Sequence, residues 1–338
     1  MGNSLPAKEP NLAKEYFCVG VGKFLDGKYE EAQKEFEEAI RHDPTLPLAY
    51  CYLGIISLEL GDLDNGMEWC EQGLAIDPEN GYLHYCLGAA FERKGKTDQA
   101  IDQYHIYLKE HPRDSECLFS LGCAYDQMGQ YEEALNYYRQ ALHFDSNHYK
   151  AFYNLALALG EMGEVTEAIE CLKQVVKITP SYWRGWVKLG LFYSYEKNWS
   201  EATSAYEQAI ELQPTIADSH YNLGLCYLTT GKAKRAIQSF KQALVLNDED
   251  ADSCFYLSIA YIDLKEHETA IRTLHETLGI DLEHEKAHYL LGRLYYMCGE
   301  KKKGDKELSF LVEQKSQLAK ALKASLKGPS PKRRKKKC

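Results

Sequence analysis

The chain has 338 residues, of which 45% are hydrophobic, 27% charged and 12% aromatic. This balance excludes collagen-like, low-complexity and mostly disordered proteins, and it is sufficient for a sizeable buried core. The formal net charge is −10, but residues 315–338 contain ten of the 40 Lys/Arg and no acid. The rest of the chain is therefore near −20, which disfavours nucleic acid or an anionic membrane as partner except through this basic end.

Targeting and cysteine patterns predict a protein kept inside a cell, in the cytoplasm, or in the nucleus if the source is eukaryotic. No apolar run is long enough to span a membrane, and none follows Met1 as a signal peptide would. The 11 cysteines are scattered without a CxxC pair, which favours reduced thiols in an apolar core over disulfides. Neither Cys nor His shows the paired short spacing of a zinc site, so we expect no metal and no cofactor.

The predicted elements begin with a lead, residues 1–12, that contains Pro6 and Pro10 and has no periodicity, so we expect it to be flexible. From Ala13 onward a pattern recurs every 34 residues, nine times. Its seventh position is Leu in every repeat except for Val19, its eighth is Gly, Ala or Ser, and its twentieth is always Ala or Gly. Each repeat has two amphipathic stretches separated by a turn, which predicts two antiparallel helices. The small residue at position 8 allows close approach, and we expect the small residue at position 20 to be its partner.

The repeat resembles the tetratricopeptide repeat, whose motif places Trp, Leu-Gly, Tyr, Ala, an aromatic residue and Pro at fixed offsets. The sixth repeat matches it fully, with Trp186, Leu189, Gly190, Tyr193, Ala202, Tyr206 and Pro214. Because one helix pair cannot bury its apolar seam alone, the repeats must stack. The resemblance implies an all-α, right-handed superhelical solenoid of nine helix-turn-helix repeats. The repeats are 13–46, 47–80, 81–114, 115–148, 149–182, 183–216, 217–250, 251–284 and 285–318.

The end of the array is predicted to be covered by a capping helix, residues 319–327. Leu318, Leu322 and Leu326 recur at i, i+4 in a Lys-rich stretch, which is typical of a helix with one apolar face. Residues 328–338 lack the apolar content for a packed element and are predicted to be disordered. Their basic run, Lys332, Arg333, Arg334, Lys335, Lys336 and Lys337, is interpreted either as a nuclear import signal or as a tail for solubility or polyanion binding.

No catalytic constellation is found, and the repeats occupy nearly the whole chain, so we expect a protein that is not an enzyme. Function is then expected on a surface. The resemblance implies that the concave groove formed by the first helices binds an extended peptide or a partner helix. Positions 2, 5, 6, 9, 12 and 13 of the first helix lie opposite its packing stripe at 100° per residue, so we assign them to this groove.

The groove positions are predicted to change charge in blocks, which would orient a partner. Glu92, Glu116 and Asp126 form an acidic block, and Asp218, Asp252 and Asp263 form another. Between them lies a basic block that resembles part of the carboxylate clamp of family members that bind chaperone C-termini, although Phe119 and Cys123 replace the expected Lys and Asn. Position 5 is mostly aromatic, which indicates either repeat packing or peptide contact. The candidate peptide-binding residues are Lys150, Tyr153, Asn154, Arg184, Lys188, Tyr221 and Asn222.

The sequence thus favours a non-enzymatic scaffold or adaptor that holds protein segments, such as an acidic segment or a terminal carboxylate, in the groove. One alternative is a chaperone that masks a segment of a secreted or assembling client. A second alternative is a nucleic-acid-associated protein that acts through the basic tail.

Overall fold

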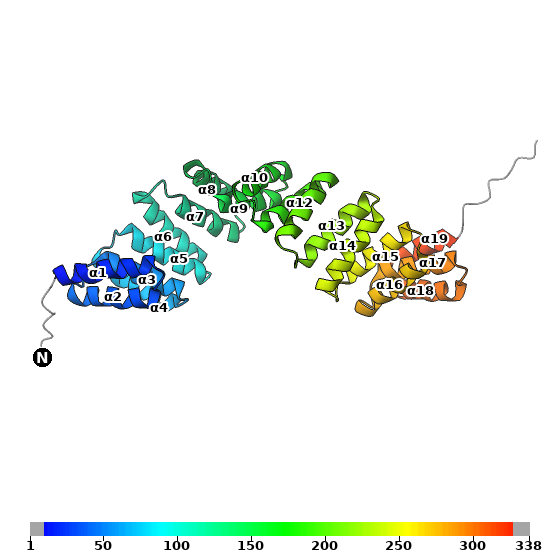
Figure 1. Ribbon diagram of the computed structural model, residues 1–338, viewed down its shortest axis with the longest axis horizontal. Coiled ribbons are helices and arrows are strands. Elements are labelled where there is room, and N and C mark those ends of the chain that lie inside the picture. Colours follow the sequence, from blue (N-terminus) through cyan, green and yellow to red (C-terminus); the bar gives the residue numbers. More distant parts are fainter. Residues whose placement is uncertain (1–9, 327–338) are drawn as a thin grey trace, which may run out of the picture. The chain divides into compact units, whose positions relative to one another are not determined.

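The computed structural model describes residues 10–326, and every regular element within them is an α-helix. The chain is therefore all-α, as the sequence predicts. The 19 helices of these residues follow one another through short turns, and the two helices of a repeat run antiparallel (Figure 1). Across the described residues, no helix combines the length and the apolar character that crossing a membrane requires.

Each repeat consists of a first helix and a second helix, and one further helix ends the series. The first helices are α1 (Pro10–Leu25), α3 (Pro47–Glu59), α5 (Gly81–Arg93), α7 (Ser115–Gln127), α9 (Tyr149–Glu161), α11 (Trp183–Tyr195), α13 (Ala217–Thr229), α15 (Ala251–Asp263) and α17 (Glu285–Met297). The second helices are α2 (Tyr29–His42), α4 (Leu63–Ile76), α6 (Thr97–Glu110), α8 (Tyr131–Phe144), α10 (Val165–Ile178), α12 (Trp199–Leu212), α14 (Ala233–Leu246), α16 (His267–Ile280) and α18 (Lys301–Glu313). The final helix is α19 (Gln317–Leu326).

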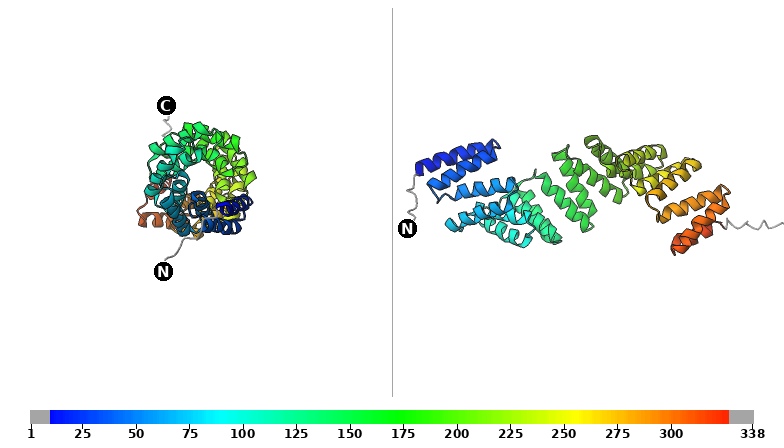
Figure 2. Two further views of the ribbon diagram at one scale, coloured as in Figure 1. Left: turned by 90° about the vertical axis from the view of Figure 1, so that its left-hand side faces the viewer. Right: turned by 90° about the horizontal axis from the view of Figure 1, so that it is seen from below.

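The chain divides into two compact units, Met1–Ile178 and Thr179–Cys338. Within each unit a helix packs mainly against its neighbours in the chain, as the stacked ribbons show (Figure 2). First helices of successive repeats also contact one another: α3 with α5 and α7 with α9 in the first unit, and α11 with α13 and α13 with α15 in the second. Each repeat therefore depends on its neighbours for burial of its apolar seam.

The two helices of a repeat are held close by an aromatic ring that packs against a glycine. A Cβ placed on Gly122 would lie 2.5 Å from the ring of Tyr138, and one on Gly190 would lie 2.9 Å from the ring of Tyr206. The ring is at position 24 and the glycine at position 8. The expected partner of the glycine, the small residue at position 20, is buried as well, and the atoms nearest to a Cβ on these two glycines belong to the ring at position 24. The ring is longer than a methyl group and reaches the glycine first.

The turn between the two helices requires a left-handed residue. Seven repeats place glycine there, from Gly27 to Gly299, with φ of 70–83°. The sixth and eighth repeats place Lys197 and Lys265 at the equivalent position, with φ of 59° and 62°. A side chain at positive φ costs conformational energy that glycine avoids. The turn geometry is therefore set by the packing of the two helices and not by the residue type alone.

A hydrogen bond to the preceding loop explains why position 4 of the repeat is often Trp, Tyr or His. In five repeats its ring donates a hydrogen bond, through N–H or O–H, to the backbone carbonyl six residues earlier, at the end of the preceding repeat. This bond satisfies a carbonyl in the loop between repeats. The pairs, at 2.8–3.2 Å, are Tyr50 with Pro44, His84 with Pro78, Trp186 with Pro180, His220 with Pro214, and His288 with Leu282.

His288 differs from the other rings because a carboxylate faces its second nitrogen. Its Nε2 donates to the Leu282 carbonyl, and its Nδ1 lies 2.6 Å from Oε2 of Glu307. A carbonyl and a carboxylate only accept, so both ring nitrogens are donors. Burial lowers the pKa of His288, but the hydrogen bonds that it donates to Glu307 and Leu282 outweigh this effect, and the net pKa is raised above its ordinary value.

The ends of the array differ in detail from the sequence prediction. Helix α1 begins at Pro10, so the expected flexible lead is wrong for residues 10–12; proline is well suited to the first turn of a helix, where its missing N–H is not needed. Residues 1–9 and 327–338, with the basic tail Lys332–Lys337, lie outside the described residues. Helix α19 begins at Gln317, two residues before the expected cap, and its Leu322 is fully buried against Gly292.

Substitution of Gly122 by Ala should destabilise the protein by about 1–3 kcal/mol, because the new methyl group overlaps the Tyr138 ring. Gly22→Ala is the matched control, since Gly22 is also within a helix but a Cβ added there would meet no atom within 4 Å. That control should stabilise the protein by about 0.5–1 kcal/mol through helix propensity. Urea unfolding followed by circular dichroism measures both, and equal midpoints would contradict the ring-on-glycine contact.

The His288–Glu307 pair should stabilise the protein most at low pH. A raised folded-state pKa gives a contribution that is fully present below the unfolded value of about 6.5 and is lost as pH rises through the folded value. Glu307→Gln should therefore lower the urea midpoint more at pH 6 than at pH 9. An effect of the substitution that is the same at both pH values would show that the pair is not an ion pair.

Candidate functional site

The first helices lie beside one another within each unit and form a continuous surface. We call the residues at positions 2, 5, 6, 9, 12 and 13 of α1, α3, α5, α7, α9, α11, α13, α15 and α17 the first-helix face. Of the predicted site residues, Lys150, Tyr153 and Asn154 come from α9 in the first unit. The remaining four come from α11 and α13 in the second unit, so each group is described by itself: Arg184, Lys188, Tyr221 and Asn222.

The predicted basic residues are accessible to different degrees. Lys150 and Arg184 are exposed, whereas Lys188 is half-buried, although all three occupy groove positions of the first helices. The Arg184 guanidinium stacks over the ring of Trp183, with 4.6 Å from its carbon to the ring centroid. Among the described residues, none of these three cations forms an ion pair, and α11 contains no acid. Their charge is therefore available to a partner.

The Asn154 side chain is already engaged within the first unit. Its Nδ2 donates to the sulfur of Cys123 across 3.2 Å. Burial raises the pKa of the Cys123 thiol to about 11, although bonds from Tyr138 and Asn154 lower it. Cys123 is thus a neutral thiol at physiological pH. The amide of Asn154 retains its oxygen and its second N–H for other contacts.

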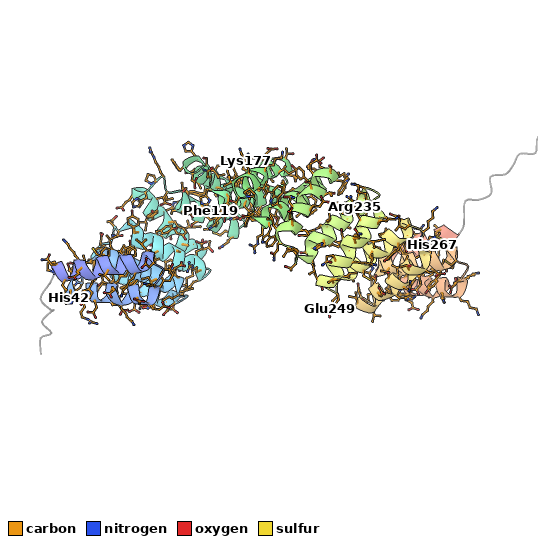
Figure 3. The ribbon with its side chains drawn as sticks, viewed as in Figure 1. His42, Phe119, Lys177, Arg235, Glu249 and His267 are labelled. Carbon is orange, nitrogen blue, oxygen red and sulfur yellow. The ribbon has the colours of Figure 1, made fainter. Side chains whose placement is uncertain are left out.

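The aromatic residues at position 5 pack between repeats. In the second unit, Tyr221 is half-buried, with ring centroids 6.1 Å from Phe240 and 5.9 Å from Tyr256. In the first unit, Phe119 of α7 (Figure 3) lies 5.9 Å from Tyr138 and 4.8 Å from His148. These contacts favour repeat packing, one of the two interpretations of the aromatic stripe. Tyr221 therefore offers a partner only part of its ring.

Several acidic residues of the predicted charge blocks have partners inside the protein. Glu92 accepts a hydrogen bond from the Tyr104 hydroxyl at 2.6 Å. Glu116 lies 3.4 Å from Nε2 of His148, and the same arrangement recurs four repeats later, where Asp252 lies 3.8 Å from His284. These two histidines also cap the next helix through Nδ1. Part of the acidic pattern is therefore explained by internal contacts, in contrast to the unpaired basic residues.

An aliphatic stripe on the second unit was missed at the sequence level. Half-buried side chains occupy positions 9 and 12 of successive first helices, with one face in the core and the other toward the first-helix face. The sequence carries the signal, because these positions belong to the predicted groove, but a pattern of charge and aromatic residues does not include aliphatic side chains. The stripe consists of Leu191, Leu225, Leu228, Ile259 and Ile262.

Replacing Tyr221 with Ala should lower the unfolding free energy by about 2 kcal/mol, because a half-buried ring between Phe240 and Tyr256 is lost. Arg184→Ala, an exposed residue of the same unit, should change it by less than about 0.5 kcal/mol. Chemical denaturation of both variants shows whether the Tyr221 ring stabilises the repeats or serves only to contact a partner. A stable Tyr221→Ala variant would assign this ring to partner contact.

Family models match successive parts of the chain. Four separate matches to the tetratricopeptide repeat cover residues 26–81, 85–114, 115–148 and 149–182. A model of the anaphase-promoting complex, cyclosome, subunit 3, matches residues 196–277. Comparison with curated proteins gives no match.

Solved structures show similar helical arrays. A crystal structure of MamA protein is 28% identical over 52% of this chain and 95% of its own, with a TM-score of 0.48. The C-terminal part of a TPR repeat-containing protein from Cytophaga hutchinsonii is 17% identical over 71% and 99%, with a TM-score of 0.59. PilF of Pseudomonas aeruginosa is 18% identical over 60% and 93%, with a TM-score of 0.55. The last two support the fold alone.

The matched models, the 34-residue period and the helix pairs agree with one another. The chain therefore belongs to the tetratricopeptide repeat family.

Proposed function

We propose that this protein is a non-enzymatic scaffold that binds an extended acidic segment of a partner along the first-helix face. The supporting observation is the pair of unpaired cations on α11, Arg184 and Lys188, in a chain that is otherwise acidic. Residues 179–314, which include α11, contain 15 Lys/Arg against 20 Asp/Glu, so acids outnumber bases there as well. A local basic site in such a surface would fix where and in which direction an acidic partner binds.

The side chains divide the binding task. Arg184 can hold a carboxylate through two parallel N–H donors, and its stacking on Trp183 restricts the guanidinium before the partner arrives. Lys188 adds a point charge. Apolar side chains of the partner would cover the aliphatic stripe on α13 and α15. In the first unit, Lys150 and the free groups of Asn154 would contribute in the same way to a segment bound there.

A chaperone that masks an apolar client segment would use the same surface, and the aliphatic stripe fits that role. The similarity of residues 196–277 to a subunit of a complex supports a lasting partner over a transient client. We therefore favour the scaffold. Release of the bound protein by a second factor would instead assign the chaperone role.

Charge reversal tests the proposal. Arg184→Glu/Lys188→Glu should reduce partner capture about tenfold in cross-linked affinity purification at physiological salt, because two attractive charges become repulsive. The matched control is Lys177→Glu/Lys234→Glu, which makes the same charge change at exposed positions of the second helices α10 and α14.

Mass spectrometry of the captured proteins reports the partner set. The control should capture the wild-type set, and helical content should be the same in all three proteins. Full capture by the Arg184→Glu/Lys188→Glu variant would exclude α11 as the binding site and direct attention to the opposite face.

A further inference from the structure

Positions 12 and 24 of the repeat are matched in polarity. Where position 24 is tyrosine in the first unit, position 12 is an acid that accepts its hydrogen bond: Tyr104 donates to Glu92 at 2.6 Å, and Tyr138 donates to Asp126 at 3.5 Å. Where position 24 is apolar, position 12 has no charge. Those pairs are Phe36 with Phe24, Cys70 with Leu58, Leu172 with Gly160, Phe240 with Leu228, Leu274 with Ile262, and Leu308 with Tyr296.

The sixth repeat breaks this match. Its position 24 is Tyr206, which is 0% exposed, and its position 12 is Ser194, which has no carboxylate. The Ser194 hydroxyl donates instead to the Gly190 carbonyl at 2.8 Å. The Tyr206 hydroxyl is buried and has no hydrogen-bond partner of good geometry among the described residues.

The unpartnered hydroxyl is directed toward the first-helix face. The ring of Tyr206 covers Gly190, one helical turn before Ser194, so its hydroxyl end lies next to Ser194. Burial raises the pKa of Tyr206, and a weaker hydrogen-bonding contribution from the neighbouring Ser194 hydroxyl opposes the shift, so the phenol keeps its proton. Ser194 itself is only half-buried and belongs to the first-helix face. A buried donor without an acceptor is costly, which indicates that an acceptor is missing here.

We propose that Ser194 and Tyr206 form a subsite for a glutamate side chain of the bound segment, whose carboxylate takes the place that Glu92 occupies in the third repeat. This inference rests on the proposed binding of an acidic segment. When the Ser194 hydroxyl turns away from Gly190, it and the Tyr206 hydroxyl both donate to the entering carboxylate. Arg184 and Lys188 lie on the same helix, α11, and attract the segment to it.

Glutamate fits this subsite better than aspartate. Glu92 reaches the Tyr104 hydroxyl at 2.6 Å, whereas the shorter Asp126 comes only within 3.5 Å of Tyr138. A side chain arriving from outside must extend at least as far as one attached to position 12. The subsite therefore selects for the length of the acid as well as for its charge.

The first test places an acidic side chain of the protein itself in the subsite. Ser194→Glu restores the acid that the third repeat has, so it should raise the urea midpoint of the free protein and weaken peptide binding about tenfold. Ser200→Glu, at an exposed position of α12, adds the same charge elsewhere and should leave binding near the wild-type value. The probe is an acetylated, amidated peptide of alternating Leu and Glu, followed by fluorescence anisotropy with the full-length protein.

The second test removes the donor. Tyr206→Phe should weaken binding of the Leu–Glu peptide about fivefold, while the free protein stays as stable as wild type, because its hydroxyl has no partner to lose. Tyr104→Phe is the matched control, and it should destabilise the free protein by breaking a bond to Glu92. Peptides with Asp or Gln in place of Glu should bind more weakly and be insensitive to Tyr206→Phe.

Several outcomes overturn the subsite. Equal binding of the Leu–Glu peptide by wild type, Ser194→Glu and Tyr206→Phe would exclude it; if Arg184→Glu/Lys188→Glu still weakens binding, the proposed function stands without it. Loss of stability in Tyr206→Phe as large as in Tyr104→Phe would show that the hydroxyl is already satisfied. If a Leu–Gln peptide with a free C-terminal carboxylate depends on Tyr206 instead, the subsite binds a chain end. Failure of wild type to bind any acidic peptide would reject both proposals.

Discussion

The packing of an aromatic ring against a backbone without a side chain determines the geometry of most of these repeats. Because Gly122 and Gly190 have no side chain, the rings of Tyr138 and Tyr206 pack directly against the backbone of the first helix. A tightly packed interior cannot absorb an additional methyl group at such a contact without displacing the ring. The crossing of the two helices, and with it the positions of the residues on the first-helix face, follows from this contact.

The same ring connects the core to the surface. Its edge reaches position 12 of the first helix, so the residue there lies at the boundary between the core and the first-helix face. A phenylalanine ring needs only an apolar neighbour at that position, whereas a tyrosine ring needs an acceptor. Glu92 provides one for Tyr104. Ser194 does not do so for Tyr206, and this difference distinguishes the sixth repeat from the third.

Charge on the first-helix face depends on which groups are already paired. Glu92 and Glu116 lie against donors of the protein itself, so their charge is partly used in stabilising the repeat. Arg184 and Lys188 have no such partner among the described residues, and α11 has no acid to offset them. A charged side chain that is already paired within the protein therefore attracts a partner less than an unpaired one does.

The sequence by itself determined the helices and their pairing, because a 34-residue period, small residues at positions 8 and 20 and turn residues such as Gly27 are local properties of the chain. It also placed Lys150 and Arg184 on the first-helix face, since the face of a helix follows from its period. Only the tertiary structure decided what each side chain touches. Asn154 is bound to Cys123, Lys188 is half-buried, and Tyr221 packs between Phe240 and Tyr256. These contacts depend on the length and direction of side chains from helices about 20–35 residues apart, and the period of a single helix contains no information about them.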